Sequence, residues 1–128
     1  MIKPLVRFRV YPEVGGCFFS VVVWPTYTSM RDATDMDDCQ AACVLGCRPV
    51  HSRGVRKMEL ATIHLARPKL DRDVIYHEAL HAAIKFAKHK RLINGKRLGE
   101  HREERVAYAA SESGKRICRK LKKLGIIK

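Results

Sequence analysis

Hydrophobic and polar positions follow a two-residue period through much of the first half of the chain. Leu5 to Tyr11 (LVRFRVY) and Lys57 to Ala66 (KMELATIHLA) alternate apolar and polar residues, which is typical of half-buried strands. Cys17 to Trp24 (CFFSVVVW) is an aromatic and β-branched run of strand length that ends at Pro25. These patterns predict three strands before residue 67.

The face of the last predicted strand follows from strict alternation. One face carries Met58, Leu60, Thr62, His64 and Ala66, and the other carries Glu59, Ala61, Ile63 and Leu65.

Two segments between these strands have weaker patterns. Thr26 to Asp38 is polar and acidic, with a short helix predicted around Met30 to Met36. Cys39 to Cys47 (CQAACVLGC) is small and apolar, which favours a buried strand over a helical turn. We expect a loop from Pro49 to Gly54.

The period lengthens to that of helices after Pro68. Asp71 or Asp73 can cap a helix that runs to about His89, and a second helix is predicted from about Glu100 to Leu124. The predicted fold class is therefore α+β, with a small, mainly antiparallel sheet followed by two long helices. We expect a single domain over residues 1–128, with strands mostly in 1–66 and helices at 70–89 and 100–124.

Composition places the chain among globular proteins. Hydrophobic residues make up 46% of its 128 residues, and no apolar run approaches the roughly 20 residues of a membrane-spanning helix. The N-terminal residues do not resemble a secretory leader, and five cysteines are an odd number. We expect a cytoplasmic protein with free thiols and no membrane contact.

The positive charge is concentrated in the C-terminal third. The formal net charge is +13, and residues 85–128 hold 15 Lys and Arg against four Glu. Such a segment can face nucleic acid or an acidic protein, or it can be a solvated helix face.

The predicted helix at 70–89 contains His77-Glu78-Ala79-Leu80-His81, an HExxH pattern. Residues four apart lie on one helix face, so both imidazoles can reach one ion, while Glu78 lies beside it as a general base. Two imidazoles and one carboxylate suit zinc with an open fourth position. The sequence therefore predicts one zinc ion bound by His77 and His81.

The third ligand must come from another element. Composition leaves Glu100, His101, Glu103 and Glu104 open, all near the start of the last helix, and each could equally be an exposed polar residue. Cys39, Cys43 and Cys47, with Cys17 or Cys118, could form a second, structural zinc site, although buried free cysteines are common.

A strand before an HExxH helix, followed by a helix carrying Glu-x-x-Ala, resembles the gluzincin zinc metallopeptidases, in particular the compact HExxH proteins encoded by phages and prophages. The resemblance covers about residues 58–113. It implies His77, His81 and Glu104 as zinc ligands and Glu78 as catalytic base. Many gluzincins have Asp where this chain has Tyr108.

The function expected on these grounds is a zinc-dependent metallopeptidase that hydrolyses a polypeptide substrate, in the host cytoplasm if phage-encoded. Tyr108 or Tyr76 could supply a hydroxyl to the developing oxyanion. The alternative is a zinc-stabilised binding protein that uses its basic C-terminal helix on nucleic acid or an acidic host protein, with little hydrolysis.

Overall fold

A computed structural model describes residues 2–13, 16–36, 40–90 and 100–128, with Ser52 and residues 100–103 described by their backbone alone. Its elements in chain order are β1 (Val6–Val10), β2 (Cys17–Trp24), α1 (Tyr27–Thr34), β3 (Ala41–Ser52), β4 (Val55–Ala66), α2 (Arg72–His89) and α3 (Glu100–Lys123). The strands form a four-stranded sheet in the order β1-β2-β4-β3.

The sheet is mixed, with its central pair parallel. β1 pairs with β2 and β3 pairs with β4 in the antiparallel sense, whereas β2 and β4 run parallel. In addition, α1 lies between β2 and β3 in the chain. The prediction of a mainly antiparallel sheet followed by two long helices is therefore wrong, although the α+β class itself is observed.

The physical reason is that β2 and β4 are joined through α1 and β3, so their relative direction is a long-range property. All eight residues of β2 are buried. A continuous hydrophobic run of this kind is typical of a strand covered on both faces, as the strands of parallel sheets usually are.

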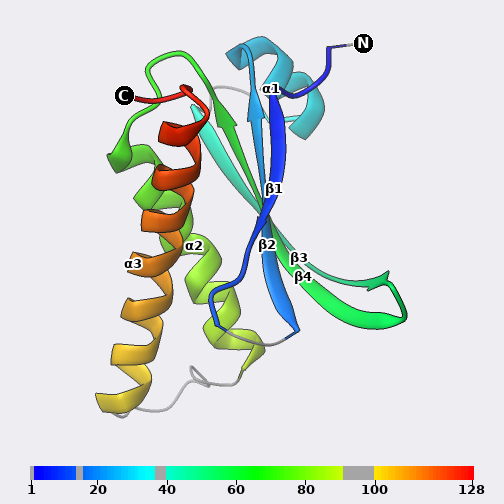
Figure 1. Cartoon of the computed structure of the whole chain (residues 1–128), viewed down its shortest axis with the longest axis vertical. Helices are drawn as coiled ribbons and strands as arrows, with labels where there is room; N and C mark the ends of the chain where they lie inside the picture. Colours follow the sequence, from blue (N-terminus) through cyan, green and yellow to red (C-terminus); the bar gives the residue numbers. More distant parts are fainter. Residues whose placement is uncertain (1, 14–15, 37–39, 91–99) are drawn as a thin grey trace.

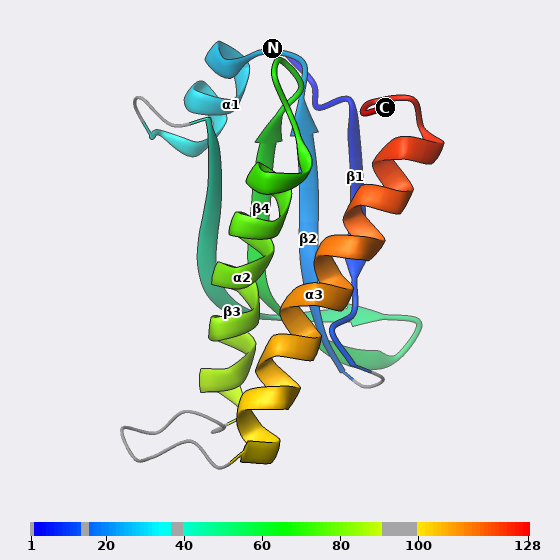
Figure 2. The ribbon, with the colours of Figure 1, turned by 90° about the vertical axis from the view of Figure 1, so that its left-hand side faces the viewer.

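The three helices form layers on the two faces of the sheet. Figure 1 shows α2 and α3 on one side of the sheet, and Figure 2, which looks onto that side, shows them side by side and antiparallel. They cover a core that includes Phe19, Val21, Ile63, Leu65 and Phe86. α1 packs on the opposite face through Met30, which contacts a smaller cluster of Val22, Trp24 and Ala66.

β3 and β4 form a hairpin at the edge of the sheet. Arg53 and Gly54 both have positive φ, 51° and 76°, as a two-residue type I′ turn requires. The loop predicted from Pro49 to Gly54 is therefore mostly strand. The prediction that the segment from Cys39 to Cys47 is a buried strand is also wrong in part. Val44 and Leu45 in β3 are 43% and 53% exposed, because β3 is the edge strand and α2 covers only part of it.

Local hydrogen bonds fix the start of α2. The Asp71 side chain accepts a hydrogen bond from the Val74 backbone N–H at 3.0 Å and caps the helix. Tyr27 in α1 donates its hydroxyl to the Pro68 carbonyl at 2.6 Å, which ties the preceding loop to the layer on the other face. In the described ranges, no helix has the length and apolar character needed to cross a bilayer.

Candidate metal centre

The HExxH residues lie in the middle of α2, which packs on the sheet through small residues. Ala79, Ala82 and Ala83 are fully buried there, together with Ile75 and Phe86. Small side chains let the helix axis come close to the sheet. His77 and His81 point away from this buried face and are exposed, so both imidazoles are open to an ion from solvent.

The two imidazoles converge on one point. Their Nε2 atoms are 3.2 Å apart, and the ring planes are nearly perpendicular, at 81°. Two zinc–nitrogen bonds of about 2.0–2.1 Å at a tetrahedral angle would place the nitrogens about 3.3–3.4 Å apart. Without metal the same contact can be an N–H···N hydrogen bond, but the spacing fits a shared zinc ion within a few tenths of an ångström.

Glu78 lies on the side of α2 that faces the edge strand. It is only 6% exposed, and burial raises the pKa of its carboxyl, while His77 and His81 act in the opposite direction. The Glu78 carboxylate also acts on the Cys43 thiol of β3. Burial, followed by the negative charge of Glu78, raises the pKa of Cys43 to about 12. A carboxylate with raised proton affinity beside two convergent imidazoles is suited to act as a base.

An open cavity of about 380 Å³ lies over this group. It is lined by His77 and Glu78, by Asp73 and Val74 one turn earlier in α2, and by Gln40 and Ala41 at the start of β3. Asp73, which the sequence offered only as a cap, precedes His77 by four residues and therefore lies on the histidine side of the helix. A count of helical spacing from His77 could have found it.

Glu104 is not brought together with the histidines. Its side chain is exposed on α3, and two contacts give the register of the helices: Gly114 lies against Tyr76, and the Arg105 guanidinium lies 5.9 Å from the centre of the Phe86 ring. Glu104 is therefore level with Phe86 and Ala87, about 8–9 Å beyond His81 along the axis. The side chains of Glu100, His101 and Glu103 lie outside the described residues.

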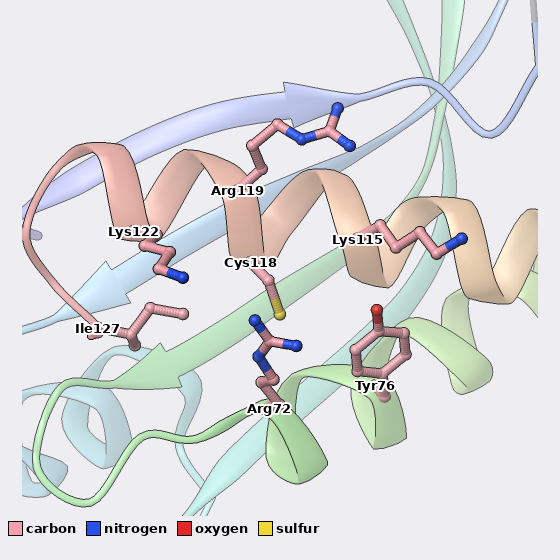
Figure 3. A pocket seen from close by; sticks show the side chains of 7 residues that line it. All are labelled: Arg72, Tyr76, Lys115, Cys118, Arg119, Lys122 and Ile127. Carbon is pink, nitrogen blue, oxygen red and sulfur yellow. The ribbon is translucent and has the colours of Figure 1, made fainter.

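Neither tyrosine considered as an oxyanion donor faces the histidine pair. Tyr108 is 61% exposed on α3. Tyr76 packs its ring against Gly114, and its hydroxyl points toward α3, as Figure 3 shows.

The cysteines give no second metal site in the part of the chain that the structure describes. Cys17 and Cys118 are buried, Cys43 is half-buried and Cys47 is exposed, all as free thiols, while Cys39 lies outside the described residues. Among the described side chains, no three of His, Cys, Asp and Glu are grouped around one point. The structure therefore brings His77 and His81 together, with no third donor grouped with them among the described side chains.

Comparisons with protein-family models, with curated proteins and with solved structures found no match for this chain.

Proposed function

We propose that this chain is a zinc-dependent metallopeptidase-like protein. The observation that supports the proposal best is the 3.2 Å separation of the His77 and His81 Nε2 atoms, with the buried Glu78 carboxylate beside them at the mouth of an open cavity. His77 and His81 have the spacing expected of the two nitrogen ligands of a zinc site. The third ligand is proposed to be Glu104, on the resemblance to gluzincins.

The chemistry follows from which groups can move a proton. When bound, zinc would supply a Lewis acid that activates water near neutral pH and polarises a carbonyl. Glu78 would accept the proton of the attacking water and then deliver it to the leaving amine, so that one carboxylate serves as base and then as acid. Its burial supports this role, because a desolvated carboxylate holds a proton more readily than an exposed one.

The edge strand offers a way to position a peptide. β3 is the last strand in the sheet, and the cavity that contains Glu78 extends to Gln40 and Ala41 at its start. An extended peptide could add to this edge through main-chain hydrogen bonds. Its scissile bond would then pass the side of α2 that carries Glu78 and His77.

Proteolysis of an unfolded protein substrate tests the proposal. Zinc-loaded protein should cleave the substrate, a chelator should stop the cleavage, and added zinc should restore it. A preparation that binds zinc at His77 and His81 but cleaves no member of a broad peptide library would refute the peptidase function while leaving the metal site intact.

A second candidate function is a zinc-stabilised binding protein that uses α3 on nucleic acid or an acidic protein. What favours it is the cluster of Lys115, Arg119 and Lys122 on one side of α3. Binding with a steep dependence on salt, in the absence of hydrolysis, would support this function over the first.

A further inference from the structure

A pocket of about 280 Å³ lies between the first turn of α2 and the C-terminal half of α3, away from the HExxH cavity. Four of its lining residues are cations: Arg72 from α2, and Lys115, Arg119 and Lys122 from α3. Tyr76, Cys118 and Ile127 complete the lining, and no acidic side chain of the described residues takes part. Figure 3 shows the Arg72 guanidinium directed toward Cys118 and the Tyr76 hydroxyl directed toward α3.

None of the four cations forms an ion pair with an acidic side chain in the described part of the protein. The ion pairs found there use Arg48, Arg105 and Arg116 as the cations. The Asp71 carboxylate, next to Arg72 in the chain, accepts a hydrogen bond from Val74 N–H as the helix cap.

The electrostatic repulsion among these four positive side chains favours an anionic ligand. Lys115, Arg119 and Lys122 follow the helical spacing i, i+4, i+7, and like charges at such spacing destabilise a helix. Arg72 adds a fourth positive charge from the neighbouring helix. A bound anion would turn this repulsion into attraction, whereas a solvated helix face needs no cation from a second element.

The packing beside the pocket holds it in shape. A Cβ atom on Gly114 would lie 2.5 Å from two ring atoms of Tyr76, so the helices are in close contact at this level and the ring is held in place. Cys118 is 7% exposed, and burial raises the pKa of its thiol, with Arg72 opposing. The thiol therefore stays neutral near pH 7 and supplies no negative charge to the pocket.

We propose that this pocket is a binding site for a phosphate group, held by the Arg72 guanidinium, the lysine ammonium groups and the Tyr76 hydroxyl. Arginine presents two parallel N–H donors to phosphate oxygens, and lysine adds mobile charge. The volume of about 280 Å³ lies just below the usual range for drug-sized ligand sites, which suits a phosphate or diphosphate group better than a large molecule.

The phosphate could belong to a soluble polyphosphate compound or to a nucleic-acid strand, and the site does not depend on the proposed zinc. The probe is inorganic pyrophosphate, titrated by calorimetry into the full chain in the presence of a chelator of zinc, at constant ionic strength. We expect saturable binding of one pyrophosphate per chain.

A matched pair of variants locates the binding. Arg72→Gln with Lys115→Gln should weaken binding by about a hundredfold, since each charge-assisted contact is worth about tenfold. Lys88→Gln with Lys123→Gln removes the same charge from exposed positions of the same helices, and should change binding less than about threefold by screening alone. Equal losses in the two variants, or binding that does not saturate, would overturn the proposal.

A further variant and two competition experiments test the same site. If the first double variant fails to fold, Tyr76→Phe keeps the ring contact and removes only the hydroxyl, so it should weaken binding by about three- to tenfold. If a short DNA duplex displaces pyrophosphate and binds the site with higher affinity than pyrophosphate does, nucleic acid is the source of the phosphate. If the duplex does not displace pyrophosphate, the ligand is a small polyphosphate. Displacement by an oligoglutamate at the same charge concentration would overturn the phosphate assignment.

Discussion

The Nε2 atoms of His77 and His81 lie 3.2 Å apart on the outer face of α2, and both rings are exposed. The pair therefore has the spacing of two ligands to one ion and an open approach from solvent. The helix that carries it is buried against the sheet on its other side, so the backbone holds the two imidazoles in a fixed relation.

The first prediction is that the protein binds one zinc ion per chain and that His81→Ala loses most of it. The remaining imidazole cannot hold zinc tightly, since protein zinc sites use three or four ligands. At a free zinc concentration of about 100 times the dissociation constant, the ion should stabilise the native protein by about 2.7 kcal/mol. Metal analysis and thermal unfolding with and without chelator measure both effects.

The control is His89→Ala, which changes an exposed histidine near the end of the same helix and should keep the metal. If His81→Ala retains a full equivalent of zinc, His81 is not a zinc ligand.

The second prediction is that Glu78→Gln keeps fold and zinc but reduces hydrolysis by about 10²–10⁴-fold, the usual size of a general-base contribution. The amide has nearly the same shape as the carboxylate and cannot accept the proton of water. Turnover of a protein substrate and metal content are measured on the same samples. Glu112→Gln, on α3 and ion-paired with Arg116, is the control and should cleave normally. Equal turnover in Glu78→Gln and the native protein would exclude Glu78 from the reaction.

Local patterns predicted the elements that carry the centre, and long-range contacts decided the rest. The aromatic and β-branched run Cys17–Trp24 is β2 with the same bounds, because a buried strand needs little beyond its own side chains to be recognised. Its parallel partner β4 could not be read from either segment. Parallel pairing depends on how the chain crosses between them.

The alternation of β4 shows why a regular period can still mislead. The pairing skips Leu60: Phe18 lies opposite Glu59, and Phe19 lies opposite Ala61. This irregularity turns Glu59 toward Ser20, whose hydroxyl donates to it at 2.6 Å, while Ala61 faces the core. Strict alternation places Glu59 and Ala61 on one face. A single extra residue in a strand reverses the pattern beyond it and leaves no mark in the hydrophobic period.

The third prediction concerns the contact between α2 and α3. Gly114→Ala should lower the free energy of unfolding by about 1–2 kcal/mol, because overpacking against Tyr76 outweighs the gain in helix propensity. The new Cβ would lie 2.5 Å from the nearest atoms of the Tyr76 ring unless the helices moved apart. Urea unfolding measures the change. In a Tyr76→Ala background, where the ring is gone, the same substitution should be neutral or stabilising. A destabilisation that persists there would place the strain elsewhere.

The fourth prediction is a pH dependence from His64. The Trp24 indole N–H donates to His64 Nδ1 at 3.0 Å, and burial, followed by the charge of Arg7, lowers the pKa of His64. Unfolded chains therefore take up a proton at a higher pH than the folded protein does. Stability should fall as the pH drops below the ordinary histidine value of about 6.5, and this contribution should level off below the folded pKa.

Urea unfolding of chelator-treated protein, followed by the fluorescence of the single tryptophan, measures this dependence at about pH 7.5 and about pH 5.5. His64→Gln should show a smaller loss of stability between the two pH values than the native protein. His51→Gln, an exposed histidine on β3, should behave like the native protein. The same loss in all three proteins would mean that His64 contributes nothing to the dependence.

The last prediction concerns the third zinc ligand, where resemblance and geometry point to different residues. Glu104 matches the Glu-x-x-Ala pattern, with Ala107 three residues later, yet it is exposed and about 8–9 Å past His81 along the helices. For Glu104 to reach the ion, the start of α3 must shift along α2 toward His81 when zinc binds. We expect Glu104→Ala to weaken zinc binding by about 10–1,000-fold, far more than Glu100→Ala, Glu103→Ala or His101→Ala, since a lost carboxylate ligand removes a strong electrostatic contact.

Asp73 is the alternative candidate for the third ligand, because it lines the same cavity as His77 and Glu78. If Asp73→Ala is the damaging change and Glu104→Ala is silent, the ligand comes from α2 itself, and the likeness to gluzincins does not extend to the third ligand.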